Sequence, residues 1–341
     1  METITISLDA MGGDNAPFSE VAGAVETVRE HDALNIILVG IKGKIESELK
    51  NHSYDPARIS IHHAPGIIEM HESPTEAIKK KPDSSLITGL KLCRHKQADA
   101  FISAGNTGAV MAASLFNLGR IANVSRPTIG SEFPTEEGTT IVFDVGANVD
   151  CKPMHLLEFA LMGSVYANHI HNIPNPTVGL LSIGEEKEKG NLLTIEAHEL
   201  LENSGLNFIG NVEGRDVLKG SVNVIVCDGF VGNVILKFAE GVLGFLKTKF
   251  KNYAEKNIVN KVKVGMAYGT LKNILKDFDY QEYGGVPLLG VNGTSIIGHG
   301  RSSPKAIKNM ILKAEHMVRA NINKIIEEKI KDIKDYSLNT T

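Results

Sequence analysis

The sequence predicts an α/β fold built on a largely parallel, doubly wound sheet. Eight short apolar runs rich in Val and Ile recur along the 341 residues, and each is followed by a turn and then by helical periodicity. Uninterrupted apolar runs are typical of parallel strands that helices cover on both faces. The predicted strands are ITISLDAM, NIILVG, RISIHHAP, ADAFISAG, TTIVFDVGAN, TVGLLSIG, NVIVCDGF and TSIIGHG.

The bulk composition fits one globular body. Apolar residues make up 42% of the chain and charged residues 22%, and α/β folds of this length often form a single unit with two lobes. We therefore expect one α/β domain over residues 1–335. The formal net charge of −4 argues against a general nucleic-acid binder, so no nucleic-acid partner is expected.

The N-terminus and the cysteines indicate the compartment. Residues 1–17 lack the basic region, apolar core and cleavage site of a signal peptide, and no stretch reaches 18 uninterrupted apolar residues. The cysteines Cys93, Cys151 and Cys227 lie far apart without CxxC spacing, which is typical of reduced thiols rather than of disulfides or a zinc site. We expect a cytoplasmic protein that does not span a membrane and has no structural metal.

Residues 247–280 predict a lysine-rich helical excursion from the body. Eight lysines face a single acid, Glu255, before Asp277. Apolar side chains with helical spacing occur at Val264, Tyr268, Leu271, Leu275 and Phe278. Three uses are compatible with this pattern: docking of an acidic carrier protein, contact with an anionic membrane surface, and a solvated face over a dimer contact.

The last predicted helix begins after Ser303, which is the expected N-cap, with Pro304 at the first helical position. Its amphipathic pattern runs to about Lys331. We expect it to pack on the body or on a second subunit.

Polar side chains gather where the predicted strands end. In open α/β sheets, ligands bind outside the carboxyl ends of the strands, where loops lead into helix N-termini. We expect six such loops to meet at one rim. Their polar residues are Asp9 and Asp14; Ser103, Asn106 and Thr107; Asp144 and Asn148; Ser182 with residues 184–191; Asp228 and Asn233; and His299 and Ser302.

The segment SAGNTGA, residues 103–109, has the composition of an anion-binding loop. Gly105 and Gly108 allow close approach of the backbone, Asn106 and Thr107 are neutral donors, and the helix that follows adds roughly half a positive charge at its N-terminus. The alternative is a tight turn in which the polar side chains only cap the helix.

Other catalytic motifs are missing from the sequence. There is no Walker A loop, no GxGxxG after a strand, no HExxH and no GxSxG. Nucleotide hydrolysis, dinucleotide binding and the usual serine-hydrolase chemistry are therefore not predicted. Cys227 ends an apolar run and is expected to be a buried, inert thiol, whereas Cys151 lies in a loop but lacks an identifiable base.

Six segments together resemble the phosphate acyltransferase family of the PlsX type. They are SLDAMGGDNAP, ISAGNTGAVMA, FDVGANVDCKP, LLSIGEEKEKGN, VIVCDGFVGNVILK and EYGGVPLLGVNG, and they follow the family's order over nearly the whole chain. The resemblance implies an enzyme, a fold similar to the isopropylmalate dehydrogenase and phosphotransacetylase group, and a homodimer.

The resemblance also implies a reaction. Inorganic phosphate attacks the thioester of a long-chain acyl group on acyl carrier protein (ACP), and acyl phosphate and free ACP leave for bacterial phospholipid synthesis. No metal or organic cofactor is expected. Because acyl phosphate must reach a membrane glycerol-3-phosphate acyltransferase, the product favours peripheral membrane contact through residues 247–280.

Roles for the polar loops follow from the same resemblance. Phosphate is expected among the helix N-termini that follow Ser103 and His299. The expected donors are the backbone at Gly105 and Gly108 and the side chains of Asn106, Thr107 and Ser302, and the candidate cations are Lys187, Lys189 and Arg301.

Acid–base and oxyanion roles fall on the other loops. Asp144 or Asp228 would orient the nucleophile or take its proton, and the donors to the tetrahedral oxyanion would be Asn148, Asn191 or Asn233. The alternative for the two aspartates is that they cap helices or tie loops together.

Two further functions stay open. The first is a short-chain phosphotransacetylase that uses acyl-CoA and shares the fold and the reaction type. The second is a non-catalytic, membrane-associated scaffold that keeps the fold. The missing nucleotide fingerprint disfavours the first only weakly, because CoA sites lack one universal motif.

Overall fold

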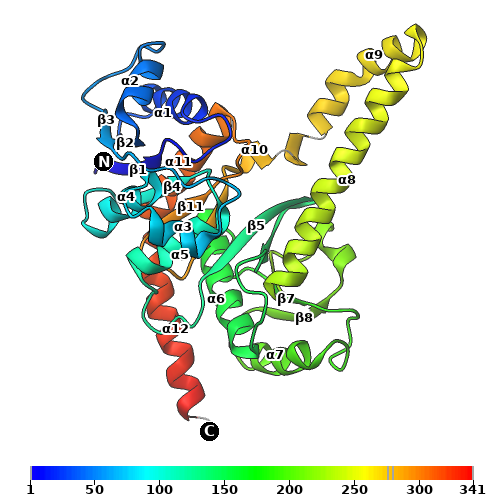
Figure 1. Ribbon diagram of the computed structural model, residues 1–341. Coiled ribbons are helices and arrows are strands. Elements are labelled where there is room, and N and C mark those ends of the chain that lie inside the picture. The colour runs from blue at the N-terminus through cyan, green and yellow to red at the C-terminus, as the bar shows by residue number, and fades with distance from the viewer. Residues whose placement is uncertain (1, 275, 279, 340–341) are drawn as a thin grey trace.

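One mixed sheet of eleven strands runs through the protein (Figure 1). The structure is a computed structural model that describes residues 2–274, 276–278 and 280–339. In spatial order the strands are β3 (Ile59–His63), β2 (Leu34–Gly40), β1 (Ile4–Asp9), β4 (Ala100–Ser103), β11 (Thr294–Ile297), β10 (Val286–Leu289), β5 (Thr128–Thr135), β6 (Gly138–Phe143), β9 (Val224–Val226), β7 (Val178–Leu181) and β8 (Phe208–Val212).

Two parallel groups of strands make up most of the sheet. β3, β2, β1, β4 and β11 are mutually parallel, and so are β6, β9, β7 and β8. Three antiparallel pairings join the groups: β11 with β10, β10 with β5, and β5 with β6. The largely parallel sheet is confirmed, and the two groups run in opposite directions.

All eight predicted strands are present, and three further strands were not predicted. β8 contains Gly210 and Asn211, β10 contains Pro287, and β5 mixes Ser131, Glu132 and Pro134 with apolar residues. Each of these features weakens the apolar run from which a buried strand is recognised.

Helices cover both faces of the sheet, as the doubly wound prediction requires. A large buried cluster on one face includes residues of α1 (Phe18–Glu30), α2 (Lys42–Leu49), α6 (Pro153–Ile170), α7 (Leu192–Glu202), α11 (Pro304–Arg319) and α12 (Ile322–Asn339). A second buried cluster includes residues of α3 (Pro74–Lys80), α4 (Ser85–Arg94), α5 (Thr107–Leu118) and the 3-10 helix η1 (Gly214–Leu218).

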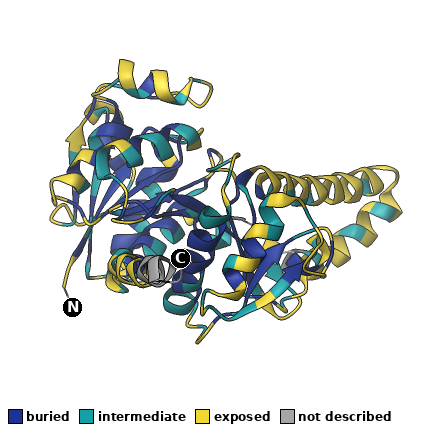
Figure 2. Cartoon of the chain, turned by 90° about the horizontal axis from the view of Figure 1, so that it is seen from below, coloured by how far each residue is buried: buried dark blue, intermediate teal, exposed yellow. Residues whose placement is uncertain are grey.

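A helical hairpin projects from the body (Figures 1 and 2). It consists of α8 (Gly229–Glu255) and α9 (Ile258–Ile274), and the short η2 (Lys276–Phe278) and α10 (Tyr280–Tyr283) lead back to β10. The predicted excursion is confirmed, but it is carried by a helix that begins at Gly229 rather than near residue 247. The predicted apolar stripe crosses the end of α9, and Leu275 lies outside the described residues.

Within the part of the chain that the structure describes, one helix meets the length and composition of a membrane span. It is α8, although only 11% of its most apolar window is buried in the protein. The sequence expectation of no span relied on the absence of 18 uninterrupted apolar residues. Lys237 and Glu240 interrupt the apolar run of α8 without lowering its mean hydropathy below the level of a candidate span.

The C-terminal segment forms two helices, not one. Ser303 caps α11, since the backbone N–H of Ala306 donates to its hydroxyl at 3.4 Å, and Pro304 occupies the first turn. The helix then ends at Arg319, and α12 begins at Ile322 and packs on α6. The break falls at Asn321, whose φ of +53° is left-handed and therefore incompatible with a continuous helix.

Candidate functional site

The ends of β1 and β4 form one buried polar cluster. The Ser103 hydroxyl donates to Asp9 Oδ2 at 2.7 Å and accepts the Gly105 N–H at 3.1 Å, while the Met11 N–H donates to Asp9 Oδ1 at 3.1 Å. A Cβ added to Gly12 would lie 2.7 Å from the Asp9 carboxylate and 2.9 Å from the Gly105 nitrogen. The predicted phosphate loop is thus locked to the loop after β1.

Asn106 is engaged within the protein. Its Oδ1 accepts the Ala109 N–H at 3.0 Å and so caps α5, and its Nδ2 donates to the carbonyl oxygens of Met70 and Glu72, both at 3.0 Å. A Cβ on Gly108 would lie 2.7 Å from Pro74, so this glycine permits the packing of α3 against α5. Exposed Thr107 leaves its hydroxyl at the N-terminus of α5.

The loop after β11 closes on the loop after β1. The Asp14 N–H donates to the Gly300 carbonyl at 2.7 Å. The Ser302 hydroxyl donates to the His299 carbonyl at 2.6 Å, and the Arg301 N–H donates to His299 Nδ1 at 3.1 Å. The predicted residues Ser103, Gly105, His299, Arg301 and Ser302 therefore belong to loops that contact one common neighbour, the loop after β1.

Asp144 organises a second cluster after β6. Its carboxylate accepts the backbone N–H groups of Ile129, Ala147 and Asn148 at 3.1, 3.1 and 2.6 Å, and the Asn148 side-chain amide at 2.9 Å. Burial raises the pKa of Asp144, and these four hydrogen bonds oppose the rise. Because all its acceptor positions are occupied, Asp144 holds the loop that carries Asn148.

Asp228 and Asn233 lie beside this second cluster. Asp228 caps α8 by accepting the Val231 N–H at 2.9 Å. Asn233 is exposed one turn later, and its Oδ1 lies 3.5 Å from the position of a Cβ on Gly146. The contacts of both aspartates match the alternative role: Asp228 caps a helix and Asp144 ties loops together.

The loop after β7 forms a third group. Lys187 pairs with Glu202 of α7, and Asn191 caps the same helix by accepting the Thr194 N–H at 3.0 Å. The Ser182 hydroxyl donates to the Lys189 carbonyl at 2.9 Å. Among the described residues the Lys189 ammonium has no ion-pair partner, whereas Lys187 is turned toward α7.

The predicted single rim is wrong in its topology. β1, β4 and β11 run in one direction and β6, β7 and β9 in the other, so the carboxyl ends of the two groups point to opposite edges of the sheet along the pairing order. The antiparallel strands β5 and β10, which the sequence did not reveal, cause this reversal. The site residues fall into a phosphate-loop group on one side and the Asp144 and Lys189 groups on the other.

The three thiols are poor nucleophiles, because their raised pKa values keep them protonated at neutral pH. Burial raises the pKa of Cys93 to about 12 and that of Cys151 to about 11, and it raises the pKa of Cys227 well above the ordinary value. Cys227 is buried, as predicted.

The buried acids that the sequence did not reveal include Glu20 and Glu132. Glu20 lies in the first turn of α1, where it resembles an ordinary helix-stabilising acid. Glu132 lies on the unpredicted strand β5, where it accepts Lys313 Nζ at 2.8 Å and the Tyr166 hydroxyl at 3.0 Å. Burial alone would raise the pKa of Glu132, but Lys313 and His171 lower it to about 2. No local motif marks either position.

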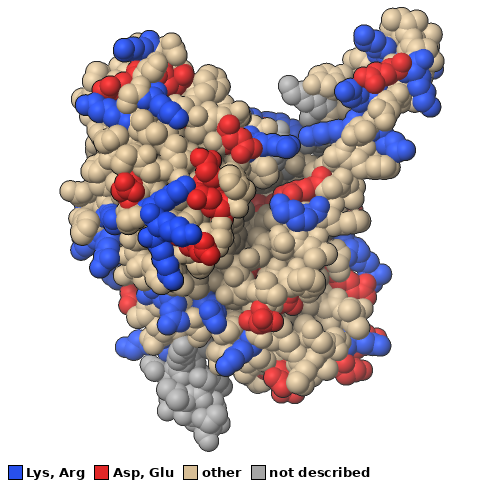
Figure 3. All heavy atoms as spheres, in the orientation of Figure 1, with Lys and Arg blue, Asp and Glu red and all other residues tan. Residues whose placement is uncertain are grey.

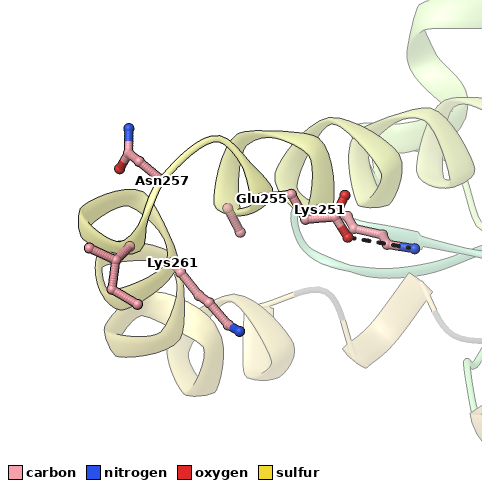
Figure 4. Close-up of a pocket in the computed structure, with 6 residues that line it drawn as sticks. Lys251, Glu255, Asn257 and Lys261 are labelled. Carbon is pink, nitrogen blue, oxygen red and sulfur yellow. Dashed lines mark ion pairs between the residues drawn. The ribbon is translucent and has the colours of Figure 1, made fainter.

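A hollow of about 490 Å³ lies at the turn of the helical hairpin (Figure 4). None of its lining residues belongs to the polar loops at the strand ends. Its lining consists of Lys251, Ala254, Glu255, Asn257, Ile258 and Lys261. Among the described residues, no group of three His, Cys, Asp or Glu side chains is arranged to hold a metal ion.

Comparisons with known proteins give the same family over nearly the whole chain. The family model described as "Fatty acid synthesis protein" matches residues 4–325. The chain is 50% identical over 336 residues to the phosphate acyltransferase of Chlorobaculum parvum, covering 96% of this chain and 98% of the relative. It is 48% identical over 332 residues to that of Dictyoglomus turgidum, with 97% and 98% coverage.

Solved structures share the fold at low sequence identity. The phosphotransacetylase of Streptococcus pyogenes superimposes with a TM-score of 0.62 at 16% identity, covering 93% of this chain and 94% of that chain. The EutD phosphotransacetylase of Staphylococcus aureus gives a TM-score of 0.61 at 16% identity with the same coverage. The predicted phosphotransacetylase-like fold is confirmed.

Proposed function

The chain belongs to the fatty acid synthesis protein family, whose relatives are phosphate acyltransferases, and from this membership we propose that it transfers a long-chain acyl group from acyl-ACP to inorganic phosphate. The observation that carries the proposal is the identity of about half of all residues to phosphate acyltransferases over nearly the full chain. Acyltransferase activity is common to these relatives. The ACP donor and the supply of phospholipid synthesis are our extension.

The proposed step is a direct substitution at the thioester carbonyl. A phosphate oxygen forms a bond to the carbonyl carbon, the C–S bond breaks, and the ACP thiolate leaves and takes up a proton from solvent. A thiol with a pKa of about 8.5 needs little help from an acid to leave. The raised pKa values of the three cysteines support a mechanism without an acyl-cysteine intermediate.

Phosphate is proposed to bind beside the Ser103–Gly105 loop. The N-termini of α5 and α11 follow this loop and the loop after β11, and helix N-termini attract anions. Exposed Thr107 supplies a free hydroxyl there. Arg301 is the proposed source of positive charge, because its loop contacts the loop after β1. Lys187 and Lys189 become the weaker candidates, since both belong to the group on the other side of the sheet and Lys187 also pairs with Glu202.

Of the three predicted oxyanion donors, Asn233 is the one we propose, and this role requires an acyl thioester that reaches from the phosphate loop to the Asp144 group. The Asn148 side chain donates to Asp144, and the Asn191 side chain caps α7. Asn233, in contrast, is exposed beside Gly146. We expect Asn233→Ala to lower kcat by about tenfold or more while the melting temperature stays unchanged. Asn260→Ala, on the hairpin, is the matched control. A wild-type kcat in Asn233→Ala would remove this assignment.

The donor is tested by comparing thioesters. Purified protein is mixed with phosphate and either long-chain acyl-ACP or short-chain acyl-CoA, and free thiol is measured. We expect phosphate-dependent thiol release from acyl-ACP. Preference for short-chain acyl-CoA would favour a phosphotransacetylase, and no release from either donor would favour a non-catalytic scaffold.

The hairpin is proposed to serve a homodimer and a membrane surface. Large apolar side chains stay exposed along α8, including Phe238 at 73%, and around the tip, including Ile258 at 74% and Met266 at 79%. Lysines gather at the outer end on the face shown in Figure 3. An apolar tip ringed by lysines fits the surface of an anionic bilayer, and the apolar length of α8 fits a second copy of the chain.

Peripheral contact is favoured over a membrane span. α8 begins directly after β9, and the chain returns through η2 and α10 to β10, so both ends of the hairpin are fixed to the body. A cytoplasmic enzyme held at the membrane in this way would release acyl phosphate close to a membrane glycerol-3-phosphate acyltransferase.

Two substitutions separate the two roles of the hairpin. Met266→Asp should abolish salt-sensitive sedimentation with anionic vesicles, whereas Asn203→Asp, which adds the same charge at the end of α7, should not. Phe238→Asp should convert a dimer to a monomer in light scattering. Unchanged vesicle binding in Met266→Asp, or the absence of any binding by the wild-type protein, would remove the membrane proposal.

A further inference from the structure

Glu20 is a buried carboxyl group without a partner. Its side chain is fully buried, and neither oxygen has a hydrogen-bond partner on another described residue. A Cβ added to Gly13 would lie 2.4 Å from Oε1, so the carboxyl rests directly against the backbone of Gly13. Buried polar groups are normally hydrogen-bonded, and an exception in a native fold requires an explanation.

The backbone that Glu20 supports lies at the centre of the proposed phosphate site. Gly12 packs against Ser103 and the Gly105 nitrogen, and the Asp14 N–H donates to the Gly300 carbonyl at 2.7 Å. The Gly12–Asp14 loop therefore touches both loops that lead into the helix N-termini of α5 and α11. A charge on Glu20 would lie directly behind this loop.

The surroundings of Glu20 do not stabilise a negative charge. Burial and the nearby Asp9 carboxylate raise the pKa of Glu20 to about 8, although its own backbone N–H opposes the rise. Asp9 has donors of its own in Ser103 and Met11. Burial also raises the pKa of Asp9, although hydrogen bonds from Ser85, Ser103 and Met11 oppose that rise. No other described residue donates to Glu20 in this way, and Glu20 is protonated at neutral pH.

Among the described residues, no cation hydrogen-bonds to the Glu20 carboxyl group or contributes to its pKa. On α11, Lys308 pairs with Glu26 and Glu30 farther along α1, and Lys305 pairs with Glu282. The other charged or titratable side chains of the adjoining loops are Asp14, His299 and Arg301.

We propose that Glu20 is a positioning residue for inorganic phosphate, which supports the Gly12–Asp14 loop as a neutral acid and so places no negative charge behind the bound anion. This role rests on the proposed function. It predicts that phosphate affinity falls when Glu20 ionises, because two like charges separated by one layer of backbone repel each other in a poorly solvated site.

The test compares phosphate kinetics at several pH values. KM for phosphate and kcat are measured from pH 6.5 to 9 for the wild-type protein, Glu20→Gln and Glu20→Met, which stay uncharged, and for the control Glu26→Gln on the same helix. From pH 7 to 9 the wild-type KM should rise about tenfold more than that of Glu20→Gln or Glu20→Met, with the change in KM and not in kcat. Glu26→Gln should follow the wild type.

Parallel KM profiles for the wild type and Glu20→Gln would overturn the proposal, as would a difference confined to kcat. Calorimetric titration with inorganic phosphate at pH 7 and pH 9 repeats the comparison without turnover. If no variant forms acyl phosphate but the wild type alone loses phosphate affinity at pH 9, the proposed function fails and the role of Glu20 stands. If turnover is normal and the KM profiles are parallel, the proposed function stands and the role of Glu20 fails.

Discussion

Replacing Glu20 by Gln should flatten the dependence of folding stability on pH. Burial and Asp9 raise the pKa of Glu20 from 4.5 to about 8. Between these values the folded protein keeps a proton that the unfolded chain has released, so the stabilisation is complete below pH 4.5 and is lost as the pH rises through 8. At about 1.4 kcal/mol per pH unit, the total loss is about 5 kcal/mol of unfolding free energy.

Urea unfolding measured by circular dichroism at pH 5 and pH 8 tests this magnitude. Of the total loss, about 3 to 4 kcal/mol falls within this window. The wild type and the control Glu26→Gln should lose that much more stability than Glu20→Gln over the same interval. Glu20→Gln differs from the wild type in this one titrating group, so the difference isolates Glu20. An equal loss in the wild type and Glu20→Gln would show that Glu20 ionises normally in the folded state.

Two further substitutions test the packing around the site and between the strand groups. Gly232→Ala places a Cβ 1.9 Å from the Asp144 carbonyl oxygen and should lower the unfolding free energy in urea by about 3 kcal/mol. The control Gly241→Ala on the same helix meets nothing within 4 Å and should be neutral or slightly stabilising. Equal unfolding midpoints for the two variants would refute the clash. Lys313→Met leaves Glu132 buried without its ammonium partner and should cost about 3 to 5 kcal/mol, and the addition of Glu132→Leu should restore most of that loss; an unchanged unfolding midpoint in Lys313→Met would contradict the buried ion pair.

The sequence predicts the parallel strands well because their signal is local. A run such as NIILVG is apolar on both faces, and only a strand covered by helices on both sides accommodates it. β10 carries Pro287 and β5 carries Glu132, so neither has an uninterrupted apolar run. The direction of a strand depends on its neighbours across the sheet, and that information is not local.

The site shows the same limit. The sequence correctly places polar residues at strand ends, and Asn106, Asn191 and Asp228 indeed begin helices there. It cannot tell whether such a side chain faces a ligand or its own helix, because both uses favour the same residue types at the same positions. The sequence does not reveal Glu20, because an acid in the first turn of a helix is common and only its burial makes it unusual.

The most direct test of the central claim is the stoichiometry of the reaction with palmitoyl-ACP. Acyl phosphate is counted from radiolabelled inorganic phosphate and compared with free ACP thiol, and thiol release is also measured without inorganic phosphate. We predict equal amounts of acyl phosphate and thiol, and no thiol release in the absence of phosphate. Thiol release that does not require phosphate, or that yields free fatty acid instead of acyl phosphate, would contradict the assignment as an acyl-ACP:phosphate acyltransferase.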